Sequence, residues 1–151
     1  DVWGEKWFWS PEVVFHKDKF YMIYTVEERL AVATSDSPLG PFTQPKDGPY
    51  HPDIREIGHK TFFDKDGRVY IYFSRLEGGN VIYGAELNDD LLSFKEGSLK
   101  RLFDESQEWE HTKDNPDPEW PVAEGPPRFV ERRGETSERR RKPRTDRRKQ
   151  R

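Results

Sequence analysis

The stretch WSPEVVFHKDKFYMIYT, residues 9–25, decides the fold class of this chain. Residues 13–15 favour a β-strand, residues 16–19 supply turn chemistry, and residues 20–24 again combine aromatic and β-branched side chains. The pattern therefore predicts a β-hairpin.

A similar pattern returns 48 residues later as TFFDKDGRVYIYF, residues 61–73. Each predicted hairpin is followed by a third strand, over residues 29–35 and 81–87, and the second unit continues into a weaker outer edge over residues 89–96. All-β units that repeat at this spacing are typical of propeller blades. Two unrelated hairpins in a β-sandwich are the alternative.

The composition agrees with an all-β chain. Of the 151 residues, 32% are hydrophobic and 36% charged, but 14% are aromatic, which suits sheets with stacked rings better than an aliphatic helical core. The chain has no cysteine, so disulfides and thiolate metal sites are excluded. It also has no apolar run near the roughly 18–20 residues that a membrane helix needs.

The charge is distributed unevenly along the chain. Residues 128–151 hold 12 Lys and Arg against 4 Asp and Glu, whereas the preceding 127 residues hold 14 against 25. We therefore expect a domain over residues 1–127 and an Arg-rich disordered tail over residues 128–151. The tail is interpreted as an out-of-frame segment; a solvated tail and a nucleic-acid-binding arm are the alternatives.

Several segments, taken in order, resemble glycoside hydrolase family 43. The resemblance is carried by residues 9–13, 21–24, 32–42, 63–67, 79–82, 84–87, 106–110 and 122–126. It implies a five-bladed β-propeller that hydrolyses α-L-arabinofuranosides and β-xylosides with inversion. The expected fold is then all-β: a partial five-bladed β-propeller with about two blades, the beginning of a third, and the basic tail.

The resemblance also implies a catalytic residue. Glu124, in the sequence Glu124-Gly125-Pro126, matches the position of the family's general acid. Inverting hydrolysis requires such an acid and a carboxylate that activates water on the opposite side of the sugar. The alternative for Glu124 is an exposed side chain in an acidic loop.

Three further residues are predicted to bind substrate. Trp9 is expected to stack on a sugar ring or, alternatively, to pack between blades, and Glu12 shares that ambiguity. His59 is expected to face the central channel, with a structural role as the alternative.

The family's pKa-modulating aspartate is expected where this chain has Gly58, which leaves that role unfilled. Asp53 is a weaker candidate for it, and Asp64 and Asp66 are better explained as turn residues.

The resulting hypothesis is a fragment of a glycosidase that is inactive in isolation, because the catalytic base is expected before Asp1. Its partner would be a plant-type oligosaccharide containing arabinose or xylose; no membrane partner is expected. No metal ligands are predicted, although the resemblance allows a calcium ion in the channel. The alternatives are a non-catalytic carbohydrate-binding propeller and a basic-tailed nucleic-acid-binding protein. The true N-terminus is expected to be missing, so the localisation stays open.

Overall fold

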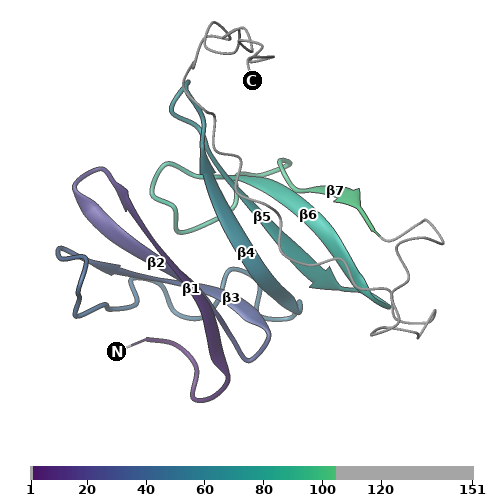
Figure 1. Ribbon diagram of the computed structural model, residues 1–151, viewed down its shortest axis with the longest axis horizontal. Coiled ribbons are helices and arrows are strands. Elements are labelled where there is room, and N and C mark those ends of the chain that lie inside the picture. Colours follow the sequence, from purple (N-terminus) through teal and green to yellow (C-terminus); the bar gives the residue numbers. More distant parts are fainter. Residues whose placement is uncertain (1, 105–151) are drawn as a thin grey trace, which may run out of the picture.

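The computed structural model describes residues 2–104, which form two antiparallel β-sheets (Figure 1). The first sheet has the order β1 (Phe8–His16), β2 (Lys19–Val26), β3 (Arg29–Ser35). The second has the order β4 (Glu56–Phe63), β5 (Val69–Leu76), β6 (Asn80–Leu87), β7 (Lys100–Phe103). Residues 2–104 contain no helix, and hence none that could span a membrane.

Tight turns connect the strands of the first sheet. Lys17 and Asp18 join β1 to β2 with φ angles of 47° and 63°, and Glu27 and Glu28 join β2 to β3 with φ angles of 50° and 58°. Two consecutive residues with positive φ match the twist of the flanking strands. Gly67, with φ 85°, serves the longer turn between β4 and β5. Both predicted hairpins are therefore confirmed.

The outer edge of the second sheet differs from the prediction. Residues 89–96 contribute one isolated bridge, between Leu87 and Phe94, and the fourth strand is β7. The reason is Leu91, which turns inward and is fully buried, while its carbonyl accepts a 2.8 Å hydrogen bond from the hydroxyl of Tyr50. In the first sheet the matching position holds only a bridge between Thr34 and Thr43.

One hydrophobic core joins the two sheets. From the first sheet it includes Tyr21, Ile23, Leu30 and Val32; from the second it includes Val69, Ile71, Phe73, Ala85 and Leu87. A smaller cluster on the other face of the first sheet is covered by Trp3 and Phe42. The two packed sheets are those of a partial β-propeller, as predicted.

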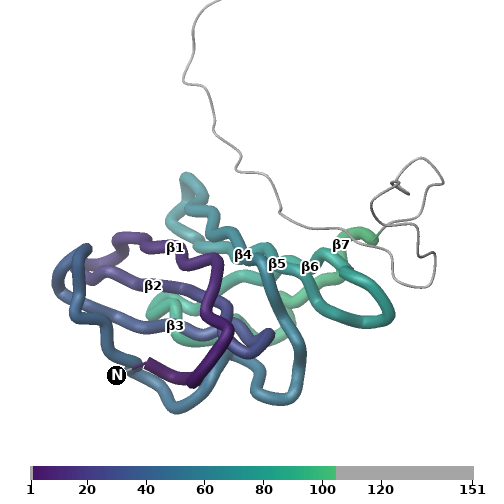
Figure 2. Tube along the Cα trace, turned by 60° about the horizontal axis from the view of Figure 1, so that its bottom comes forward, coloured from purple at the N-terminus to yellow at the C-terminus, as the bar shows by residue number. Residues whose placement is uncertain are grey.

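The strand β4 brings the second sheet against the first. The N–H of Glu56 donates a 2.9 Å hydrogen bond to the carbonyl of Glu28 in the β2–β3 turn, which fixes the beginning of β4. Among the described residues, β4 is the one strand of the second sheet whose backbone lies close to β1, β2 and β3. Figure 2 shows β1 and β4 along the same side of the molecule. Residues near the beginnings of these two strands therefore meet.

Candidate functional site at the beginnings of β1 and β4

Both first strands carry an irregularity near their beginnings. The pairing register shifts between Trp9 and Glu12 in β1, and between Ile57 and Lys60 in β4. These pairs are separated by the same 48 residues as the hairpins. Bulges of this kind redirect side chains and are frequent beside active sites.

The carboxylate of Glu12 connects the two sheets at this point. It forms an ion pair with the Lys60 ammonium group and accepts a 2.8 Å hydrogen bond from the N–H of Thr61. Burial on its own would raise the pKa of Glu12, but these partners outweigh it and hold the pKa below its usual value. The side chain is 17% exposed. The Glu12 carboxylate is therefore ionised and links the two sheets, and little of it is accessible to a ligand.

The imidazole of His59 is enclosed beside this ion pair. The residue is 8% exposed, and neither ring nitrogen has a hydrogen-bond partner in the described part of the chain. Burial lowers the pKa of His59 to about 4; the Glu12 carboxylate and the nearby backbone of Ile23 oppose this shift, and the Lys60 ammonium adds to it. The ring is therefore neutral at pH 7.

Trp9 and Gly58 belong to the irregularities of β1 and β4. Trp9 is half-buried in β1, opposite Thr25 and directly before the bulge. A Cβ atom on Gly58 would meet no atom within 4 Å, so a side chain at this position has open space around it. The structure thus brings Glu12 and His59 together, whereas Trp9 forms no hydrogen bond, ion pair or ring contact with either of them.

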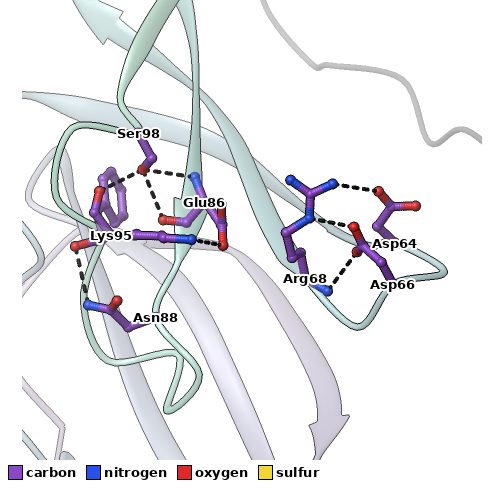
Figure 3. Close-up of polar contacts among 8 residues, drawn as sticks. Asp64, Asp66, Arg68, Glu86, Asn88, Lys95 and Ser98 are labelled. Atoms are coloured by element: carbon purple, nitrogen blue, oxygen red, sulfur yellow. Dashed lines mark hydrogen bonds and ion pairs between the residues drawn. The ribbon is translucent and has the colours of Figure 1, made fainter.

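The other predicted carboxylates lie elsewhere. Asp53 is exposed in the linker before β4. Asp66 accepts hydrogen bonds from the backbone and side chain of Arg68 (Figure 3), and the carbonyl of Asp64 accepts one from the N–H of Gly67. Asp64 and Asp66 are turn residues, as the sequence indicates. Glu124 and the basic tail lie outside the described residues.

Sequence reasoning missed an ionic network directly before the bulge of β4. Glu56 is fully buried, and its carboxylate accepts a 2.9 Å hydrogen bond from Nε of Arg75. Nη2 of Arg75 lies 2.8 Å from the same oxygen, and Nδ1 of His51 lies 3.0 Å from both oxygens. The Arg75 guanidinium also lies over the ring of Tyr83. Nothing in the sequence marks Glu56 as buried: Arg75 is its cross-strand partner in the β4–β5 hairpin, and His51 joins them only when the linker folds back.

The calcium ion that the resemblance allows has no cluster of side-chain ligands among the described residues. Within residues 2–104, no three or more His, Asp or Glu side chains gather where they would hold a metal ion. We therefore assign no step to a metal.

Comparison with known proteins identifies the family of this chain. The family model described as "Glycosyl hydrolases family 43" matches residues 1–136. The chain belongs to glycosyl hydrolase family 43. Two curated relatives are each 34% identical over 87 residues, or 52% of this chain: "Xylosidase/arabinosidase 43A" of Humicola insolens and "Beta-xylosidase" of Xylanibacter ruminicola. The matched part spans 25% and 26% of their lengths.

Solved structures of family 43 proteins share the fold. A structure described as an endo-1,4-beta-xylanase from Bacteroides thetaiotaomicron is 40% identical, with a TM-score of 0.67, over 73% of this chain and 38% of that one. A thermostable family-43 glycoside hydrolase is 36% identical, with a TM-score of 0.69, over 82% of this chain and 42% of that one. The chain thus spans about two fifths of these family members.

Proposed function

We propose that this chain is part of a family 43 glycosidase that hydrolyses O-glycosyl bonds of arabinofuranosides or xylosides with inversion. Family membership carries the proposal, and the printed names of the curated relatives support its substrate class. In this proposal the ligand lies beside the paired bulges of β1 and β4, where the two units carry equivalent irregularities.

In this proposal Glu124 is the general acid and Trp9 offers an aromatic face to the sugar. Glu12 and His59 are largely buried, so in this proposal they support the shape of the site and do not contact the sugar through a charged group. Arabinose- or xylose-containing oligosaccharides of plant type are the proposed ligands.

The 151-residue chain is expected to be inactive on its own. An inverting mechanism needs two carboxyl groups roughly 6.5–9.5 Å apart, and a general acid or base contributes about 10²–10⁴-fold to the rate. Within residues 2–104, Glu12 is paired with Lys60, and Gly58 provides no carboxylate.

The test uses 4-nitrophenyl α-L-arabinofuranoside and 4-nitrophenyl β-D-xyloside. We expect no turnover by this chain, turnover by a chain extended to the length of its solved relatives, and strong loss of activity toward xylo-oligosaccharides in the extended Glu124→Gln variant. An extended Glu124→Gln variant of full activity would show that the acid is misassigned.

A non-catalytic carbohydrate-binding propeller is the second candidate, favoured by Gly58 at the position where an acidic residue is expected. It predicts that the extended chain binds xylo-oligosaccharides in calorimetry without cleaving them.

A further inference from the structure

The tripeptide Lys-Asp-Gly occurs twice in this chain, at residues 46–48 and 65–67. In an Asp-Gly sequence the aspartate carboxyl can react with the following backbone nitrogen, because glycine has no side chain to keep the two groups apart. The ring that forms is a succinimide, and water opens it either to aspartate or to isoaspartate. The two copies share this chemistry, so a difference between them must come from their surroundings.

The backbone and the free space at the two glycines are alike. Gly48 and Gly67 have φ angles of 83° and 85°. A Cβ atom added to either glycine would meet no atom within 4 Å. Asp47 and Asp66 are both exposed. Crowding and backbone conformation therefore do not distinguish the two copies.

Hydrogen bonds hold both reacting groups of the second copy. The N–H of Gly67 donates a 3.1 Å hydrogen bond to the carbonyl of Asp64. The Asp66 carboxylate accepts a 3.0 Å hydrogen bond from the N–H of Arg68 and a second one from its Nε (Figure 3). The backbone and side chain of Arg68 also hold the pKa of Asp66 below its usual value. The carboxylate thus stays charged, and a charged carboxylate is the poorer electrophile.

The first copy lacks these contacts. Among residues 2–104, neither the Asp47 carboxylate nor the N–H of Gly48 has a hydrogen-bond or ion-pair partner. Asp47 lines a hollow together with Trp3 and Glu5, which leaves room for its carboxyl group to turn. Both reacting groups of this copy are therefore free to meet.

We propose that Asp47 is a site of spontaneous isomerisation to isoaspartate, whereas the β4–β5 turn protects Asp66. The backbone nitrogen of Gly48 attacks the side-chain carboxyl carbon of Asp47 and forms a C–N bond, while the amide proton and the carboxyl hydroxyl leave as water. Water then adds to the succinimide. Breaking its bond to the side-chain carbonyl restores aspartate, and breaking its bond to the main-chain carbonyl gives isoaspartate.

The modification would loosen the N-terminal segment. In isoaspartate the main chain runs through the side chain of residue 47 and is one carbon atom longer. This moves the Gly48 carbonyl, which accepts a 2.8 Å hydrogen bond from Nε2 of Gln44. Oε1 of Gln44 in turn accepts hydrogen bonds from the N–H of Trp3 and the hydroxyl of Tyr24. Residues 2–6 should therefore lose part of their attachment to this loop.

Incubation of the full 151-residue chain at neutral pH in heavy-oxygen water tests the proposal. Peptide mapping by mass spectrometry locates the heavy oxygen gained on succinimide hydrolysis, and electron-transfer fragmentation distinguishes isoaspartate from aspartate. We expect isoaspartate to form about tenfold or more faster at residue 47 than at residue 66, because the hydrogen bonds of the second copy must open before the attack. In guanidinium chloride the two sites should react at similar rates.

A matched pair of variants assigns the signal. Asp47→Glu should remove the heavy oxygen from this position, because glutamate would have to close a larger ring. Asp66→Glu should leave the rate at Asp47 unchanged. Hydrogen exchange of residues 2–6 should be faster in the isomerised protein than in fresh protein.

The proposal is overturned if residues 47 and 66 isomerise equally fast in buffer. It is also overturned if the preference for residue 47 is the same in guanidinium chloride, since the local sequence would then suffice. Unchanged hydrogen exchange of residues 2–6 in the isomerised protein would overturn the loosening of the N-terminal segment.

Discussion

At the scale of single residues, His59 links the stability of the protein to pH. Its folded pKa of about 4 lies below the usual value of 6.5, so the folded state favours the neutral ring. The associated stability is present above pH 6.5 and is lost as the pH falls from 6.5 through 4, by an amount on the order of 3 kcal/mol. We expect His59→Leu to remove this loss, measured as the free energy of unfolding in urea between pH 7 and pH 4.

His16→Gln is the matched control, because the His16 ring has a hydrogen bond with the carbonyl of Asp89, whereas the ring nitrogens of His59 have no such partner among the described residues. The free energy of unfolding of the His16→Gln variant should fall between pH 7 and pH 4 by as much as that of the unchanged chain. The same pH dependence in His59→Leu as in the unchanged chain would show that another group is responsible.

The Glu56–Arg75 pair allows a second prediction at this scale. Glu56→Gln leaves the buried guanidinium without a charged partner, so we expect a loss of about 3–5 kcal/mol in the free energy of unfolding. Glu28→Gln removes the same type of partner from Arg55, but the side chains of Arg55 and Glu28 are 45% and 35% exposed. That variant should lose at most about 1 kcal/mol. If urea unfolding gives equal losses of free energy for Glu56→Gln and Glu28→Gln, burial does not determine how much these two ion pairs contribute to stability.

At the scale of secondary-structure elements, the bulges of β1 and β4 are equivalent but carry different residues. Gly58 has positive φ and open space around it, so Gly58→Asp should cost only about 1 kcal/mol for the left-handed backbone. Gly58→Val should cost about 2–3 kcal/mol, because β-branched residues fit this conformation poorly. Thermal unfolding of the two variants measures the difference.

Ser10→Gly is the reciprocal control, since Ser10 holds the same conformation with φ 49°. It should be neutral or slightly stabilising. Severe and equal destabilisation by Gly58→Asp and Gly58→Val would indicate that the space at this bulge is filled.

At the scale of the whole molecule, the shared core makes the two sheets one folding unit. Phe73 is fully buried and belongs to the cluster that includes residues of both sheets. We expect Phe73→Ala to cost about 3–5 kcal/mol and to raise hydrogen exchange in β2 and β5 together. Met22→Ala, in the cluster confined to the first sheet, should have a smaller effect. Faster exchange in β5 alone would show that the sheets unfold independently.

The strands and hairpins were predictable from sequence because they depend on local patterns. Aromatic and β-branched alternation around Asp-Gly and Lys-Asp turns specifies antiparallel pairing without reference to distant residues. The 48-residue repeat placed Glu12 and Lys60 at equivalent positions of the two units, but it did not predict that their side chains meet.

The tertiary structure alone decided what these positions do. Glu12 bonds Lys60 and Thr61 only because β4 packs against the first sheet, and His51 reaches Glu56 only because the linker folds back beside the cross-strand pair of Glu56 and Arg75. The burial of Leu91 beside Tyr50 likewise depends on the tertiary structure. Because of it, the fourth strand is β7 and not residues 89–96. Local pattern determines which segments become strands; burial and charge pairing between sheets depend on contacts that no local pattern encodes.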